Sequence, residues 1–255
     1  MTVPAARRDP RLRRYPLRRL RLPVARGTLS LVVPAAAEWL HTGGWAAAAA
    51  RGEEPPYWAD VWPAAVAVAR WLLRRRDLHG VQVLDLGCGL GVPGTVAAHL
   101  GACVTFADLH EDALAFAAFN ATHAGADSQR VRTVPHDWHG PTLPGTFAIL
   151  CLADVSYRPV HHPALLRHLR ACLADDGVAV HADPFRRESD GFVVQLARVF
   201  ATAQATTDTH FGDRRLPVRL VLAARTAAAL ARWTARPGGA AAGDGSGARS
   251  ATVAR

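Results

Sequence analysis

Short apolar runs that alternate with helical segments from residue 81 onward place the strongest constraint on how this chain can fold. The apolar runs lie at 81–87, 103–108, 131–137, 147–154 and 178–183, and the helical segments at 93–100, 110–124, 162–174 and 189–202. Runs such as VQVLDLG lack a regularly alternating polar face, which is typical of parallel strands covered by helices on both sides. A closing pair of runs, 209–213 and 218–225, is too closely spaced for a helical crossover and predicts an antiparallel end to the sheet. We therefore expect an α/β fold with seven strands, mostly parallel.

Changes in composition divide the 255 residues into four parts. Residues 1–26 hold nine Arg and four Pro, and we expect them to form a disordered tail. Residues 27–54 hold a short apolar run and a broken helical segment, and we expect them to pack on the core as an extension. The main domain is predicted at 55–226. Residues 236–255 are rich in Gly, Ala and Ser and predict a second disordered tail.

The formal net charge of +9 comes from the ends of the chain. Residues 27–225 carry 17 Arg against 19 acidic residues, a net charge of −2, so the main domain offers no basic groove for nucleic acid. For the Arg-rich start, a solvated tail is favoured over a segment that binds RNA or an anionic surface. The chain contains no Lys, so no lysine of its own can act as nucleophile, base or target of self-modification.

Cysteine usage and hydropathy indicate the cellular compartment of the protein. The four Cys form no CxxC pair and three lie in or beside apolar stretches, which favours reduced thiols over disulfides or a zinc site. No apolar run reaches the length of about 20 residues that a membrane-spanning helix needs, and the start lacks a secretory signal. We expect a cytoplasmic protein without a membrane partner.

A glycine-rich loop follows the first buried run. Gly87, Gly89 and Gly91 have G-x-G-x-G spacing between a predicted strand and a predicted helix, where a ligand can approach backbone N–H groups. The dinucleotide fingerprint requires its third glycine one residue later, where this chain has Val92. Asp85, just before the loop, is unfavourable for a pyrophosphate but suits a ligand with a cationic amino-acid end. This favours S-adenosylmethionine over a dinucleotide; the alternative is a tight turn in which Asp85 bonds its own loop.

Acidic residues also end the next two strands. Asp108, 17 residues after Gly91, is placed to accept hydrogen bonds from both hydroxyls of a ribose. The same residue begins a D-x-x-E pattern, so a helix capping box with Glu111 is an alternative that does not exclude ribose binding. Asp137 and Trp138 follow the third strand, where they can hold and cover an adenine; the alternative is an ordinary turn with a half-buried Trp.

Asp154 and Asp183 extend this pattern to five strand ends on one rim of the sheet. In open α/β sheets, ligands bind beyond the carboxyl ends of the strands, so the rim predicts the position of the site. Each acid taken singly also suits a loop start, where Asp is favoured. The His residues lack metal-ligand spacing to acids or Cys, and we expect no metal site; His136 is kept as a candidate pocket residue.

Four segments together resemble one family. They are PYWADVWP (56–63), VLDLGCGLG (83–91), DVSY (154–157) and ADPFRRESDGF (182–192). The chain over about 55–195 resembles the class I, seven-β-strand methyltransferases that use S-adenosylmethionine. Within that class it is similar to the protein lysine methyltransferases of the electron-transfer flavoprotein beta-subunit type. The resemblance implies a Rossmann-like sheet with an antiparallel final strand and helices on both faces.

The resemblance also implies residue roles. Asp154 and Tyr157 would face the target amine as the catalytic residues, Trp58 would line the cofactor site, and Trp62 and Asp183 the substrate site. Asp85 and the three loop glycines would hold the methionine end of the cofactor, Asp108 its ribose, and Asp137 with Trp138 its adenine. The implied activity is methyl transfer to an amine nitrogen, with a protein lysine as acceptor. The alternatives are a small-molecule N- or O-methyltransferase, an NAD-binding oxidoreductase and a nucleic-acid-binding protein; the oligomeric state stays open.

Overall fold

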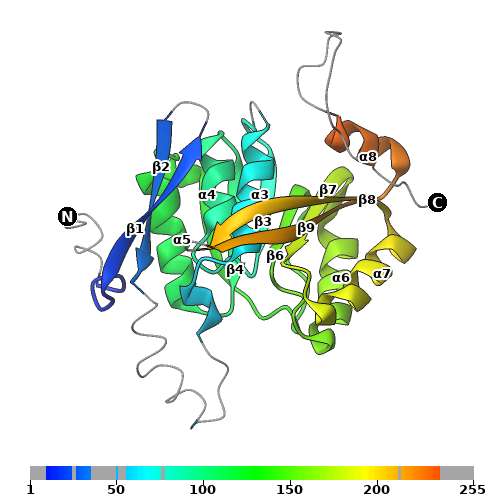
Figure 1. Ribbon diagram of the computed structural model, residues 1–255. Helices are drawn as coiled ribbons and strands as arrows, with labels where there is room; N and C mark the ends of the chain where they lie inside the picture. The colour runs from blue at the N-terminus through cyan, green and yellow to red at the C-terminus, as the bar shows by residue number, and fades with distance from the viewer. Residues whose placement is uncertain are drawn as a thin grey trace, which may run out of the picture.

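A computed structural model describes residues 10–24, 27–35, 50, 56–75, 78–211 and 214–235 (Figure 1). The strands are β1 Leu17–Val24, β2 Gly27–Pro34, β3 Gln82–Leu86, β4 Cys103–Asp108, β5 Val131–Pro135, β6 Phe147–Ala153, β7 Leu173–Asp183, β8 Ala201–Phe211 and β9 Arg214–Ala224. The α-helices are α3 Pro63–Leu73, α4 Val92–His99, α5 Glu111–His123, α6 His162–Cys172, α7 Asp190–Val199 and α8 Ala227–Thr234. The expected broken helix at 34–50 and the tail at 236–255 lie outside the described residues, apart from residues 34, 35 and 50.

The main sheet has seven strands in the order β5-β4-β3-β6-β7-β9-β8. The pairs from β5 to β7 are parallel, and β9 is antiparallel to both β7 and β8. This confirms the predicted parallel sheet with an antiparallel end. The strand order reverses next to β3, so the carboxyl ends of β3, β4 and β6 open onto a common crevice, the usual ligand position in such sheets.

Two hydrophobic cores flank the sheet, as expected for strands that are apolar on both faces. On β3, Val83 faces the core formed with α3, α4 and α5, whereas Leu84 and Leu86 face the core formed with α6 and α7. Figure 1 shows α3, α4 and α5 side by side on one face and α6 and α7 together on the other. The two layers hold the sheet and its carboxyl edge in place.

The N-terminal residues depart from the expectation of a tail. Residues 17–24 form β1, which pairs with β2 along its whole length, so the prediction of disorder was wrong there. Leu12 is fully buried and Leu22 nearly so, because the leucines interspersed among the arginines supply an apolar face. The Arg and Pro content obscured that pattern; residues 1–9 and 25–26 lie outside the described residues.

The β1–β2 hairpin packs on the outer side of α5 (Figure 1), where one buried amide joins them. Asn120 Oδ1 accepts the Val32 N–H at 2.7 Å, and Asn120 Nδ2 donates to the Val32 carbonyl at 3.0 Å. Nδ2 also donates to the Leu90 carbonyl at 3.2 Å. The hairpin is therefore linked through α5 to the glycine-rich loop.

We expect Asn120→Ala to lower the free energy of unfolding by about 3 kcal/mol, because it leaves buried backbone groups of Val32 and Leu90 without partners. Urea denaturation measures the loss, and limited proteolysis of the hairpin should become faster. Gln129→Ala, which removes an exposed amide, is the matched control. A loss below about 0.5 kcal/mol would show that the hydrogen bonds do not stabilise the hairpin.

The C-terminal part of the domain differs from the sequence expectation in two places. β8 begins at Ala201, eight residues before the predicted run, because its first eight residues (ATAQATTD) have little hydrophobic signal. Helix α8 follows the predicted domain end at 226 and buries Ala229 and Leu230. Trp233 of α8 also forms a hydrogen bond to β7, because its Nε1–H donates to the Asp176 carbonyl at 2.8 Å.

Candidate active site

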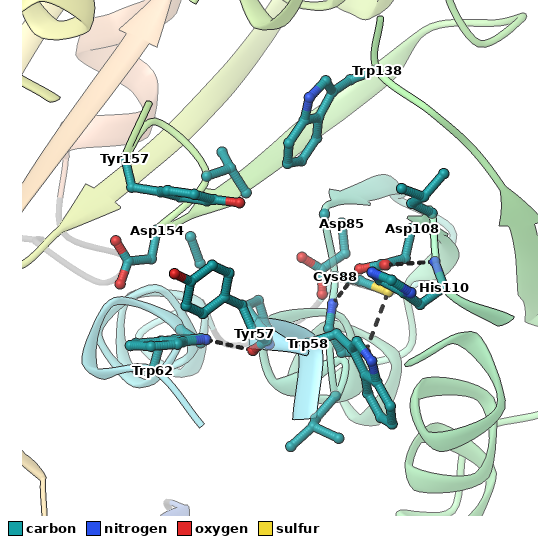
Figure 2. Close-up of a pocket in the computed structure, with 18 of the residues that line it drawn as sticks. Tyr57, Trp58, Trp62, Asp85, Cys88, Asp108, His110, Trp138, Asp154 and Tyr157 are labelled. Atoms are coloured by element: carbon teal, nitrogen blue, oxygen red, sulfur yellow. Dashed lines mark hydrogen bonds between the residues drawn. The ribbon is translucent and has the colours of Figure 1, made fainter. Parts of the chain in front are cut away.

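A cavity of about 280 Å³ opens at the carboxyl edge of the sheet, between the glycine-rich loop and the loops after β4, β5 and β6. The sequence-predicted site residues that line it are Trp58, Trp62, Asp85, Gly87, Gly89, Asp108, Asp137, Trp138, Asp154 and Tyr157. Gly91 and Asp183 are not among the lining residues. Figure 2 shows Asp85 and Asp108 on one side of the opening and Asp154 with Tyr157 on the other. Four of the five predicted acids, from different strand ends, therefore line one cavity.

The loop glycines have left-handed backbones, with φ of 67°, 50° and 70° at Gly87, Gly89 and Gly91. At Gly91 a Cβ atom would lie 2.6 Å from the Ala117 Cβ and 2.8 Å from its Cα, so a side chain there would separate the loop from α5. Gly91 therefore keeps the loop against α5, and Gly87 and Gly89 form the wall of the cavity.

Asp85 lies beneath the loop and is 1% exposed. Its Oδ2 accepts the Gly94 N–H from the first turn of α4 at 2.9 Å. The alternative role for Asp85, a hydrogen bond to the backbone that follows it, is therefore also observed. Burial raises the pKa of the Asp85 carboxyl to about 7. A cation that enters the cavity would stabilise the ionised form, which suits an ammonium group.

Asp108 is buried at the end of β4, with two backbone hydrogen bonds to its carboxylate. Oδ2 accepts the Gly89 N–H at 2.8 Å and Oδ1 accepts the His110 N–H at 3.0 Å. The first bond ties β4 to the glycine-rich loop, and the second forms a turn before α5. The alternative of a capping box is not observed, because the N-cap of α5 is His110 and no side chain caps it. Burial raises the pKa of Asp108, and these N–H groups oppose the rise.

Asp137 and Trp138 form the turn after β5. Asp137 is exposed and accepts the His139 N–H at 2.8 Å, as an ordinary turn would predict, yet both residues line the cavity. A Cβ at Gly87 would lie 2.8 Å from the Trp138 ring, so this indole lies over the glycine-rich loop. The ring is therefore placed to cover a flat group bound beside the loop.

The opposite side of the cavity is aromatic and leads into a smaller adjoining cavity. Tyr57, Trp62, Asp154, Tyr157 and Arg186 line the smaller space, and the first four also line the larger one. The Tyr57 ring lies edge-on to Tyr157 at 5.6 Å and to Trp62 at 5.9 Å between ring centroids. Burial raises the pKa of Tyr157 to about 12, so its hydroxyl stays protonated at neutral pH.

Trp58 holds the aromatic segment against the core. It lies in the short 3₁₀ helix Tyr57–Ala59, packs against Phe116 of α5, and meets Tyr15 edge-on at 5.7 Å. The Tyr15 hydroxyl in turn donates to Asp112 at 2.5 Å. The segment before β1 thus supports a wall of the cavity, a role that the sequence analysis did not assign to it.

Asp154 is buried at the end of β6 with a left-handed backbone, φ 58°. Its carboxylate receives two hydrogen bonds from Arg186, from Nε to Oδ1 at 2.6 Å and from Nη2 to Oδ2 at 2.8 Å. Burial raises the pKa of Asp154, and Arg186 opposes the rise. Neither Arg186 nor Tyr57 was predicted as a site residue from the sequence, although both lie inside segments that carried the family resemblance.

Asp183 requires a correction. It is fully buried below the rim, and Arg219 of β9 donates to both of its oxygens, at 2.9 and 3.0 Å. Asp183 Oδ1 also accepts the Arg186 N–H at 2.9 Å. It was predicted to bind substrate; its carboxylate instead anchors the turn that carries Arg186, because the antiparallel β9 places an arginine beside it.

Histidines lie in two pairs beside Trp138. His136 and His168 have their Nε2 atoms 2.8 Å apart, and His139 Nε2 lies 2.9 Å from His161 Nδ1. Burial lowers the pKa of His161 to about 4, so that imidazole is neutral at neutral pH. His136 lines the cavity, as the sequence analysis allowed. No group of three or more His, Cys, Asp or Glu among the described residues is arranged to hold a metal ion.

The donor set fits S-adenosylmethionine. Asp85 would offer a carboxylate to the ammonium group, Asp108 would offer one to the ribose hydroxyls, and Gly87 and Gly89 would leave the backbone of the cavity wall without side chains. The sheet order, with its antiparallel end and its site beyond β3 and β4, has the same arrangement as the seven-strand methyltransferases. Fold and cavity together define a class I methyltransferase dependent on S-adenosylmethionine.

The chain belongs to the lysine methyltransferase family, whose model matches residues 56–198. It is 34% identical over 161 residues to the protein N-lysine methyltransferase METTL21A of Danio rerio, covering 60% of this chain and 72% of that protein. Over 56 residues it is 46% identical to the electron transfer flavoprotein beta subunit lysine methyltransferase of the same species, covering 21% of this chain and 22% of that protein. The family is thus established by sequence over most of the predicted main domain.

A solved structure supports the fold. The chain superposes on magnesium protoporphyrin IX methyltransferase (ChlM) from Synechocystis PCC 6803 with bound SAM, with a TM-score of 0.51 and 22% identity. The match covers 63% of this chain and 77% of that one. At this identity the likeness concerns the architecture of the sheet and helices only.

Proposed function

We propose that this methyltransferase modifies the ε-amine of a lysine in a protein substrate, and that the acceptor enters beside Asp154. The observation that carries the proposal is that Tyr57, Trp62 and Tyr157 line both cavities together with the Asp154 carboxylate. We call the space between these aromatic side chains the acceptor passage. A narrow aromatic passage suits an unbranched alkyl chain with a cationic end. The relatives named as protein N-lysine methyltransferases support a protein as the source of that chain.

The cofactor lies, in this proposal, on the other side of the larger cavity. Asp85 pairs with its ammonium group, Asp108 accepts from its ribose hydroxyls, and Asp137 with Trp138 encloses its adenine. Gly87 and Gly89 admit its methionine part, and Trp58 forms a wall. S-adenosylmethionine supplies a methyl group on a positively charged sulfur. Asp154 and Tyr157 lie across the cavity from Asp85 and Asp108, which would hold the cofactor.

The protein contributes alignment and removal of water, which an in-line displacement mainly requires. The lone pair of the acceptor nitrogen forms the new bond to the methyl carbon while the carbon–sulfur bond breaks and leaves its electron pair on sulfur. The methylated nitrogen then releases a proton to solvent. Asp154 accepts an N–H of the acceptor and orients its lone pair, a positioning role that needs no strong base.

The aromatic walls bear on how many methyl groups are added. Tyr57, Trp62 and Tyr157 lower the pKa of a bound amine by excluding water, and their ring faces tolerate a methylated ammonium. We therefore expect the enzyme to add more than one methyl group to the same nitrogen. Mass spectrometry of the modified peptide over a time course measures the number, and a product that stops at one methyl group would contradict this expectation.

Labelling of proteins in a lysate of the source organism tests the proposal. With radioactive S-adenosylmethionine, the purified protein should label at least one protein, and Asp154→Ala should not. Because this chain has no lysine, its own band provides an internal control against self-modification of a lysine side chain. Label confined to small molecules would instead favour a small-molecule N- or O-methyltransferase.

The predicted cytoplasmic location is consistent with the state of the cysteines. Cys88, Cys103, Cys151 and Cys172 are all free thiols. Free, mostly buried thiols fit a reducing compartment. Among the described residues, no helix has the length and hydrophobicity that crossing a bilayer requires.

A further inference from the structure

Arg186 occupies the end of the proposed acceptor passage. Its guanidinium binds both oxygens of Asp154 and lies 5.5 Å from the centre of the Trp62 ring. A carboxylate and an aromatic face are the two features that would otherwise hold a lysine ammonium. The side chain of Arg186 therefore already supplies the positive charge for which the passage is built.

Backbone strain fixes this arrangement. Asp154 and Phe185, with φ of 58° and 55°, are the two non-glycine residues with positive φ in the described part of the chain. Phe185 directly precedes Arg186, and the Asp154 N–H donates to the Ala182 carbonyl at 2.8 Å. Asp183 anchors the same turn through the Arg186 N–H. One strained position at a partner of the ion pair, Asp154, and another directly before the second partner indicate that the geometry of the pair has a function.

The charge of Asp154 determines which form of the acceptor binds. An unpaired carboxylate in this half-enclosed passage would stabilise a lysine ammonium and raise its pKa, yet only the uncharged amine can attack the methyl group. Arg186 neutralises the carboxylate and leaves each oxygen a further lone pair for an acceptor N–H. The pair can thus orient a neutral amine without favouring its protonation.

We propose that Arg186 is a positioning residue that neutralises Asp154, so that the acceptor lysine is held beside the cofactor as the uncharged amine. The inference rests on the proposed lysine acceptor and adds the electrostatic condition under which that acceptor reacts. It assigns to the turn after β7, which carries Arg186, a role in the protonation state of the substrate. The titratable and charged groups that face the pair are Tyr57, Tyr157, Asp183 and Glu188.

The test measures kcat and KM of Arg186→Gln between pH 7 and pH 9.5, with the labelled lysate protein as substrate. We expect the pKa that governs kcat to rise by about one pH unit, so kcat falls about tenfold at pH 7.5 and recovers at high pH. KM stays the same or falls, because the freed carboxylate attracts the ammonium. Arg187→Gln makes the same charge change at an exposed neighbouring residue and should leave the profile unchanged.

Other outcomes separate the possible failures. Arg186→Lys retains the charge and should keep the wild-type pH profile. This variant still tests the inference if Arg186→Gln is unstable. An equal loss of kcat at every pH, or a raised KM, would assign Arg186 a purely structural role and overturn the inference. A kcat that rises at pH 7.5 would identify Arg186 as a competitor of the substrate and also overturn it. Absence of any labelled protein with the wild-type enzyme would refute the proposed function itself.

Discussion

Asp154→Ala is expected to lower kcat about 100-fold or more while the Kd for S-adenosylmethionine changes less than about threefold. The carboxylate lies at the junction of the two cavities, on the side opposite Asp85 and Asp108 (Figure 2), so its loss removes orientation of the acceptor and not the cofactor contacts. Misplacement of a reacting group by about 1 Å is enough for a 100-fold loss. Single-turnover kinetics with the labelled protein substrate measure kcat, and calorimetry measures Kd.

Two further variants test whether the loss of kcat is specific to the Asp154 carboxylate. Asp175→Ala removes a fully exposed aspartate near the start of β7, far along the strand from the site, and should have normal kcat. Asp154→Asn keeps a hydrogen-bond acceptor without the charge, so it should retain more activity than the alanine variant. Activity of Asp154→Ala within threefold of wild type would remove Asp154 from the acceptor site.

Much of the fold could be predicted from the sequence because the patterns that specify its strands are local. Each central strand is an apolar run that ends at an acid or a glycine, and parallel strands bring those ends to one edge. Asp85, Asp108 and Asp154 could therefore be placed on the cavity from their positions along the chain alone. The two faces of β3, with Val83 on one side and Leu84 on the other, follow from the same alternation.

The residues that were missed depend on contacts distant in the sequence. Arg186 reaches Asp154, 32 residues earlier, only because Phe185 adopts a left-handed backbone, which no sequence pattern encodes. Asp183 points away from the cavity because Arg219 comes to it from an antiparallel strand 36 residues later. The Asp183–Arg219 pairing is set by the antiparallel pairing of β7 with β9, and the strand end alone does not distinguish a rim acid from a buried one.

The tail expected at residues 1–26 was assigned from composition, which ignores pairing. β1 is ordered because it pairs with β2 along its whole length and because Asn120 fixes β2 to α5. An edge hairpin with arginines among its leucines resembles a charged tail unless its partner strand is considered. The same hairpin region supports Trp58 through Tyr15, so part of the site depends on a segment outside the family match.

Asp85→Asn is expected to weaken S-adenosylmethionine binding about 100-fold and, at pH 8, to stabilise the protein without cofactor. The affinity falls because an ammonium group would lose its buried counter-charge, a loss that typically costs 2–5 kcal/mol. The stability rises because the Asp85 carboxyl is 1% exposed and its pKa is raised to about 7 by burial. Above that pH the folded state must keep an unfavourable buried charge, which asparagine lacks, while its amide oxygen can still accept the Gly94 N–H.

The pH dependence of stability provides the control for the Asp85→Asn prediction. Between about pH 4 and pH 7 the folded protein holds a proton on Asp85 that the unfolded chain releases, so the contribution of Asp85 to stability falls as pH rises through that window. Wild type and Asp85→Asn should therefore melt at similar temperatures at pH 5, and the variant should melt several degrees higher at pH 8. Binding of S-adenosylmethionine to the wild type at pH 6.5 should release a proton, seen as a heat that depends on the buffer. Equal melting temperatures at both pH values, together with unchanged cofactor affinity, would mean that Asp85 neither carries a buried charge nor binds the ammonium group.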